Sequence, residues 1–270
     1  MIMHPHTPSY PRFATLVLLL IGLSVGLLSA AENQETGASV MEKVAQAQKA
    51  SSSAMDIQMT LIDGKSEDRV RRIQTLSLSE EDITKTITIF LTPASVKNTR
   101  FLTIARTIGS DDQWIFLPAL GKVKRIAASE TGGSFMGSDF TYADMASTTY
   151  ATDEAVHTLL RTETYEGRLC HVVQSIPLEA KDYGRTVTWI DSERYVVMQV
   201  EFYQKDKQTL QKRLDSADVR QVGNRWMAYK MTMSTLSSGH QTQIEILQAK
   251  FDLTLPAAYF TVGFLETGRI

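Results

Sequence analysis

Apolar and polar residues alternate with a period of two along most of the chain, which is the pattern of half-buried β-strands. The first clear run places Met55, Ile57, Met59 and Leu61 on one side, with polar residues between them. Further strands are predicted at residues 69–79, 83–91, 99–106, 113–117, 122–127, 157–165, 169–176, 185–190, 195–203, 209–221, 225–236 and 241–251. Short turns and no long helix separate these strands. The pattern therefore predicts a mainly β fold, with a strongly curved antiparallel sheet or an incomplete β-barrel.

One helix precedes the strands. Val40, Met41, Val44 and Ala47 recur at spacings of three and four, which predicts an amphipathic helix over residues 38–50. Its apolar strip is shallow, so the helix needs a partner surface to remain folded.

Several strands are apolar on both sides. Trp114 and Phe116 point one way, and Ile115 and Leu117 point the other. Such a strand must be covered on both faces. We therefore expect helices on the outside of the sheet and a core or a ligand on its inside. Because few residues are predicted helical, we expect only one face to be covered fully.

Residues 225–236 form the most unusual strand. Met227, Tyr229, Met231 and Met233 share one face of it. Methionine side chains are flexible and polarisable, so this face suits apolar ligands of variable shape. Methionines that merely fill gaps in a packed core are the alternative.

The first 31 residues have the form of an export signal. Arg12 precedes an apolar run at 13–28, and Ser29-Ala30-Ala31 supplies small residues for cleavage after Ala31. An uncleaved anchor is the alternative, although the run is shorter than the roughly 20 residues of a spanning helix. We expect a signal peptide at 1–31 and one β domain at 32–270.

Charge and cysteine content exclude several classes of protein. Removal of residues 1–31 removes one charged residue, Arg12, and leaves 27 basic and 30 acidic residues. This balance argues against nucleic-acid binding, which normally needs a basic face. The single cysteine, Cys170, excludes an internal disulfide framework and is expected to be a buried, inert thiol.

No catalytic or metal-binding pattern emerges. His157, His171 and His240 are far apart and lack metal-ligand spacing. Ser134 has one residue too many before Gly137 to form a nucleophile elbow. We therefore predict no enzyme, no catalytic residue, no metal and no cofactor; an esterase that uses Ser134 is a weak alternative.

Residues 111–145 differ from the strands around them. Two short strands are predicted to be joined at 118–121 and followed by a loop containing Gly132, Gly133 and Gly137. A short helix is then expected from about Ser138, where Ser138 or Asp139 would accept hydrogen bonds from free backbone N–H groups. The glycines either supply unusual backbone angles or act as hinges of a lid.

This stretch resembles the periplasmic LolA-like carriers of the outer-membrane lipoprotein-sorting family, in the branch associated with resistance-nodulation-division exporters. The matching residues are Trp114, Leu117, Pro118, Ala119, Leu120, Lys122, Val123, Arg125 and Ile126, then 134–140, Tyr142 and Asp144. Elsewhere the resemblance is diffuse, although the order of strands fits.

The resemblance implies a LolA/LppX-like fold, in which short helices cover the concave face of the sheet, and a function in the periplasm. It implies a carrier that binds acyl chains of lipoproteins or other lipids in a hydrophobic cavity, for sorting to the outer membrane. Its partners would be an inner-membrane transporter or exporter and an outer-membrane acceptor, and not nucleic acid. The alternative is an accessory subunit of a resistance-nodulation-division-type membrane exporter that carries no cargo.

The resemblance and the strand pattern together select the candidate site residues. Those expected in the cavity or its lid are Trp114, Phe116, Phe135, Met136, Phe140, Met227, Tyr229, Met231 and Met233. Lys122 and Arg125 are expected to contact a partner protein or anionic head groups, with a solvated strand edge as the alternative.

Overall fold

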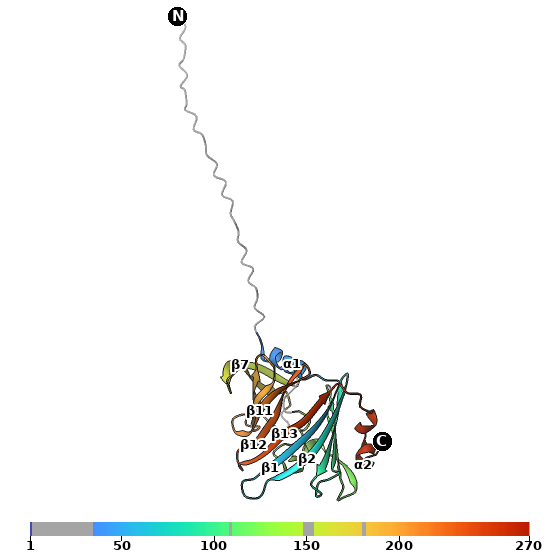
Figure 1. Ribbon diagram of the computed structural model, residues 1–270. Coiled ribbons are helices and arrows are strands. Elements are labelled where there is room, and N and C mark those ends of the chain that lie inside the picture. Colours follow the sequence, from blue (N-terminus) through green and yellow to red (C-terminus); the bar gives the residue numbers. More distant parts are fainter. Residues whose placement is uncertain (2–34, 108–109, 148–153, 180–181, 270) are drawn as a thin grey trace. The chain divides into compact units, whose positions relative to one another are not determined.

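The computed structural model describes residues 1, 35–107, 110–147, 154–179 and 182–269 (Figure 1). The chain divides into two units, residues 1–34 and 35–270, and the fold lies in the second. The expected signal peptide at 1–31 lies outside the described residues, apart from its first residue. No helix in the described ranges is long and apolar enough to cross a membrane.

The second unit is built on one antiparallel sheet of thirteen strands. The strands are β1 (Ser52–Ile62), β2 (Arg69–Glu80), β3 (Ile83–Thr92), β4 (Arg100–Arg106), β5 (Asp112–Leu117), β6 (Lys122–Arg125), β7 (Ala155–Tyr165), β8 (Arg168–Pro177), β9 (Arg185–Asp191), β10 (Val197–Tyr203), β11 (Leu210–Val222), β12 (Arg225–Thr235) and β13 (His240–Phe251). Their order is β6-β5-β4-β3-β2-β1-β13-β12-β11-β10-β9-β8-β7. The predicted mainly β, antiparallel fold is confirmed.

The first and last strands meet in the middle of this sheet. β1 pairs with β13 along its length, so one meander runs from β1 to the edge strand β6 and the other runs from β13 back to the edge strand β7 (Figure 1). The segment between β6 and β7 must therefore cross from one edge of the sheet to the other.

The two faces of the sheet follow from its register. Ile57, Ile73, Phe90, Phe101 and Ile115 lie on one face, which we call the inner face; residues from the β6–β7 segment pack against it. Residues in between point to the outer face, as strand geometry requires. In this half of the sheet apolar residues of both faces pack against other segments, although the few residues predicted helical favoured full cover of one face only.

Helix α1 (Gly37–Gln48) lies near its predicted position and covers part of the inner face. Thr36 caps it, accepting a bond from the Ser39 backbone N–H, because a hydroxyl there satisfies a free donor. Val40, Met41 and Val44 pack against Val173 and Ile190 of β8 and β9.

The chain ends in two short elements that the sequence pattern did not predict, η3 (Ala257–Phe260) and α2 (Val262–Thr267). Phe260, Phe264 and Leu265 pack on the outer face against Leu76, Ile87 and Leu102. Arg100 fixes the end of α2: its Nε donates to Leu265 O over 2.6 Å and Nη2 to Glu266 O over 3.1 Å. Short helices thus cover both faces, α1 the inner and α2 the outer.

Candidate functional site

Residues 127–147, the described part of the segment between β6 and β7, pack against the inner face, and we call them the plug. It contains two 3₁₀ turns, η1 (Ala128–Glu130) and η2 (Phe135–Gly137), followed by turns. The helix predicted from Ser138 is wrong. Ser138 Oγ donates instead to Phe135 O over 2.7 Å, and Phe135 N donates to Phe140 O over 2.8 Å, which closes a tight loop.

Backbone angles in this loop test the expectation about its glycines. Of the three, Gly137 has positive φ (72°), as does its neighbour Met136 (52°). Gly132 and Gly133 have no such angle. The Ser134 hydroxyl donates to Ser138 O over 2.6 Å, so it stabilises the turn.

Aromatic side chains anchor the plug to the β2–β5 side of the inner face. Phe135 is fully buried, and its ring lies 5.0 Å from that of Phe101 and 5.9 Å from that of Phe90. Tyr142 completes the cluster, with its ring 5.6 Å from Phe135.

Phe140 anchors the plug to the opposite side. It is buried with Tyr183, Phe202 of β10, Leu214 of β11 and Met233 of β12. Only four residues lie between Phe135 and Phe140, so this short loop links the two meanders of the sheet through the interior.

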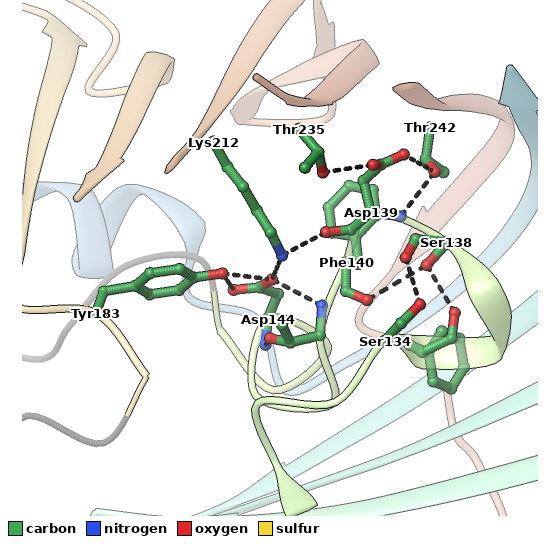
Figure 2. A network of polar contacts seen from close by, with 11 residues as sticks. Ser134, Ser138, Asp139, Phe140, Asp144, Tyr183, Lys212, Thr235 and Thr242 are labelled. Atoms are coloured by element: carbon green, nitrogen blue, oxygen red, sulfur yellow. Dashed lines mark hydrogen bonds and ion pairs between the residues drawn. The ribbon is translucent and has the colours of Figure 1, made fainter. Parts of the chain in front are cut away.

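A buried carboxylate provides the main polar anchor (Figure 2). Thr235 Oγ1 and Thr242 Oγ1 donate to the Asp139 carboxylate over 2.5 and 2.7 Å, and His240 Nδ1 lies 2.6 Å from it. The Asp139 N–H in turn donates to Thr242 Oγ1 over 2.9 Å. The prediction that Asp139 lies at a helix start is therefore wrong: its carboxylate bonds to side chains of β12 and β13.

A second buried carboxylate, Asp144, lies next to the first (Figure 2). The Tyr183 hydroxyl donates to it over 3.1 and 3.2 Å, and the Thr141 N–H over 2.8 Å. Burial, and then the charge of Asp144, raise the pKa of Tyr183, so its hydroxyl keeps the proton that it donates. Lys212 Nζ lies 3.7 Å from Asp144 and donates to Asp139 O over 2.7 Å.

Two further side chains bind the plug from the other half of the sheet. Arg71 of β2 donates to Met136 O over 2.8 Å, and Gln113 of β5 donates to Tyr142 O over 2.7 Å. Both lie on the inner face. The plug is therefore held by polar contacts from both meanders as well as by its two buried phenylalanines.

The methionine face, Met227, Tyr229, Met231 and Met233, also lies on the inner face. Met233 is fully buried against the Phe140 cluster, while Met227 and Tyr229 pack farther along the strand with Ile246. Met231 contacts both groups and is only half-buried.

Half-buried apolar residues continue from Met231 across the neighbouring strands. Met55 and Ala249 are cross-strand partners and pack with the Met227–Tyr229 group, and Ile57 follows on β1. All three are half-buried. We call Met55, Ile57, Met227, Tyr229, Met231 and Ala249 the apolar section of the inner face.

The remaining candidates lie elsewhere. Trp114 and Phe116 point to the outer face and pack with the α2 cluster, because Ile115 between them takes the inner position. Phe135, Met136 and Phe140 belong to the plug, with Met136 half-buried. The structure thus separates the first two residues from the others.

The basic candidates lie on the edge strand β6. Lys122 is exposed, and the Arg125 side chain is 68% exposed while it pairs with Asp112. The Arg125 guanidinium also lies 6.0 Å from the Trp114 ring. Both side chains remain available to a partner.

Sequence reasoning missed the strand residues that hold the plug: Arg71, Gln113, Lys212, Thr235, His240 and Thr242. Some signal was present, because Lys212 alternates in phase with Leu214 and so falls on a buried face of its strand. A charged residue at such a position needs a partner.

Two observations bear on metal binding and on thiol chemistry. No group of three or more His, Cys, Asp or Glu side chains in the described ranges could hold a metal ion. Cys170 is fully buried; burial, and then Asp191, raise the pKa of its thiol to about 11. The expected buried thiol is confirmed.

Comparison with known proteins identifies the family. A family model with the description "uncharacterized protein" matches residues 82–267, whereas no curated protein matches. An outer membrane lipoprotein-sorting protein domain from Vibrio parahaemolyticus is 31% identical, with a TM-score of 0.80, over 85% of this chain and 98% of that one.

Two more distant structures share the fold. A DUF1329 family protein from Desulfovibrio piger is 24% identical (TM-score 0.80; 85% of this chain, 97% of that one). A LolA superfamily protein from Nitrosomonas europaea is 19% identical (TM-score 0.69; 85% and 99%). The chain thus belongs to the outer-membrane lipoprotein-sorting family and shares its fold with a LolA superfamily protein.

Proposed function

We propose that this protein is a periplasmic carrier that binds acyl chains of lipoproteins or other lipids against the apolar section, for sorting to the outer membrane. One observation carries the proposal beyond family membership. Met55, Ile57 and Met231 face the interior of the sheet, yet they remain half-buried although the plug and α1 cover the same face. An acyl chain would complete their burial.

The gain from such burial is sufficient for binding. Transfer of an acyl chain out of water contributes about 0.8 kcal/mol for each CH₂ group. Methionine side chains adapt to chains of different shape, which suits a protein that must accept and release its cargo. The carboxylate of Asp139 is hydrogen-bonded to Thr235 and Thr242, and that of Asp144 lies beside Lys212 of β11, so neither is left without a partner next to an apolar ligand.

A charge placed in the apolar section tests this function. Met231→Lys should weaken binding of a dansyl-labelled fatty acid at least tenfold, since the ammonium would lie against the acyl chain. Leu247→Lys is the matched control, because Leu247 is 42% exposed on the neighbouring strand β13. Thermal unfolding of both variants shows whether the fold is retained. Equal affinities for the two variants, or no binding by the wild type, would contradict the proposal.

The second candidate is a cargo-free accessory of a resistance-nodulation-division-type exporter. The plug favours it, since Phe135 and Phe140 already fill part of the interior. In that function Lys122 and Arg125 on the exposed β6 edge would contact the exporter. Their replacement by glutamate would then abolish exporter binding, whereas Met231→Lys would have no effect on it.

A further inference from the structure

The inner face of β2–β5 changes character beyond the phenylalanine cluster. Thr75 and Ser77 of β2 face the same side as Ile73, and Thr86 and Thr88 of β3 lie directly opposite them. Thr103 of β4 extends the row. We call these five residues the hydroxyl section; Gln113 of β5 pairs with Thr103 at its far end.

Two buried polar atoms in this region have no hydrogen-bond partner. They are Thr75 Oγ1 and Gln113 Oε1, although the Gln113 side chain uses its Nε2 on the plug. Gln113 is only 3% exposed. A buried polar atom without a partner is costly and rare in native proteins, so each of the two indicates that something else completes it. Thr75 is paired with Met55 of β1, whereas Gln113 lies three strands away from Thr75 on β5.

Solvent exposure of the hydroxyl section decreases from β2 towards β4. Thr75, Ser77 and Thr86 are half-buried, whereas Thr88 and Thr103 are 2% and 3% exposed. Ser77 and Thr86 bond to each other over 2.8 Å, which orients that pair. None of the five residues carries a charge.

This region is continuous with the apolar section. Thr75 is the direct cross-strand partner of Met55, which belongs to the apolar section. Side chains at such paired positions are about 4.5–5.5 Å apart at Cβ. A ligand whose chain lies along Met55 would therefore bring its head next to Thr75.

We propose that the hydroxyl section binds the neutral, hydroxyl-bearing head of an acylated ligand, such as the glycerol of an acylglycerol, while the chain occupies the apolar section. A hydroxyl on the head can both donate to and accept from the neighbouring serine and threonine hydroxyls. Thr75 Oγ1 can donate or accept. This inference rests on the proposed function and adds the chemical class of the head group.

Two lipids that share a chain and an ester test the proposal. Monopalmitoylglycerol carries free hydroxyls and methyl palmitate carries none, and each is measured by displacement of the dansyl-labelled fatty acid. The wild type should bind monopalmitoylglycerol roughly three- to tenfold more tightly than methyl palmitate, the effect of one or two hydrogen bonds. Thr75→Val should remove most of this preference, whereas Thr75→Ser, which keeps the hydroxyl, should retain it.

Thr75→Val should not harm the fold, because its hydroxyl has no partner within the protein. Its melting temperature should equal or exceed that of the wild type. Thr232→Val, on β12 between Met231 and Met233 and facing outward, is the matched control and should keep the preference. Equal wild-type affinities for the two lipids, or an unchanged preference in Thr75→Val, would overturn the head-group proposal alone. Failure of both lipids to bind would overturn the proposed function as well.

Discussion

Asp139 should contribute more to the stability of this fold than any exposed carboxylate. Asp139→Ala removes a group that accepts from two threonine hydroxyls and lies 2.6 Å from His240 Nδ1. Hydrogen bonds to a charged group contribute about 1.5–3 kcal/mol each. Thr235 and His240 are half-buried and can bond to water after the substitution, so the lower end applies and the total is about 4 kcal/mol.

Thermal and denaturant unfolding measure this loss. For a domain of roughly 150–250 residues, 1 kcal/mol corresponds to about 2–4 °C, so Asp139→Ala should unfold about 8–16 °C below the wild type. Asp139→Asn keeps the shape of the side chain and one acceptor oxygen, so its unfolding temperature should lie between those of Asp139→Ala and the wild type. Asp68→Ala, at an exposed position, is the control.

A second assay follows the plug itself. With Asp139 gone, chymotrypsin should cleave more readily at Phe135, Phe140 or Tyr142, which are otherwise protected on the inner face. A melting temperature within about 2 °C of the wild type, together with unchanged proteolysis, would refute the claim that Asp139 anchors the plug.

Three further predictions concern the rest of the domain. Arg100→Met should lower the free energy of unfolding by about 2–3 kcal/mol, because it removes the two hydrogen bonds to the end of α2. It should also speed amide hydrogen exchange at residues 262–267, and unchanged exchange there would contradict the role of Arg100 in holding α2. Burial opposes ionisation of Asp191, but bonds from Arg168 and from the Glu193 and Arg194 N–H groups outweigh it and hold its pKa below the usual value. That stabilisation is present above about pH 4 and is lost as pH falls through the folded-state pKa. Asp191→Asn should therefore lower the free energy of unfolding in urea at neutral pH and make it less dependent on pH below pH 4. An unchanged pH dependence in this variant would count against the role of Asp191. Cys170, fully buried with its pKa raised to about 11, should react with iodoacetamide only after unfolding, and rapid labelling of the native protein would contradict its placement.

The strands were predictable because their alternation is a local property. Successive residues on one face of a strand lie two positions apart, as Arg71 and Ile73 do in β2, and one residue of slip would reverse every side chain. Helix α1 was equally local. By contrast, α2 has only six residues, and its position depends on Arg100, 165 residues away from Leu265 in the chain.

The candidate site was only partly predictable. The methionine face could be found because its four residues share one strand. Which side of β5 faces inward could not, since Trp114 and Ile115 are both apolar and the choice depends on partners from distant strands. The plug contacts are non-local for the same reason: Asp139 meets residues that lie 96–103 positions later in the chain.

The central claim is that this protein carries lipid, and its natural cargo tests that claim most directly. The protein should be purified from its own periplasm under non-denaturing conditions, weighed by native mass spectrometry and then extracted with organic solvent. We predict a mass excess that disappears on denaturation and an acylated molecule in the extract. A protein that arrives without bound lipid and also fails to bind the dansyl-labelled fatty acid would contradict the account and leave the exporter accessory as the better one.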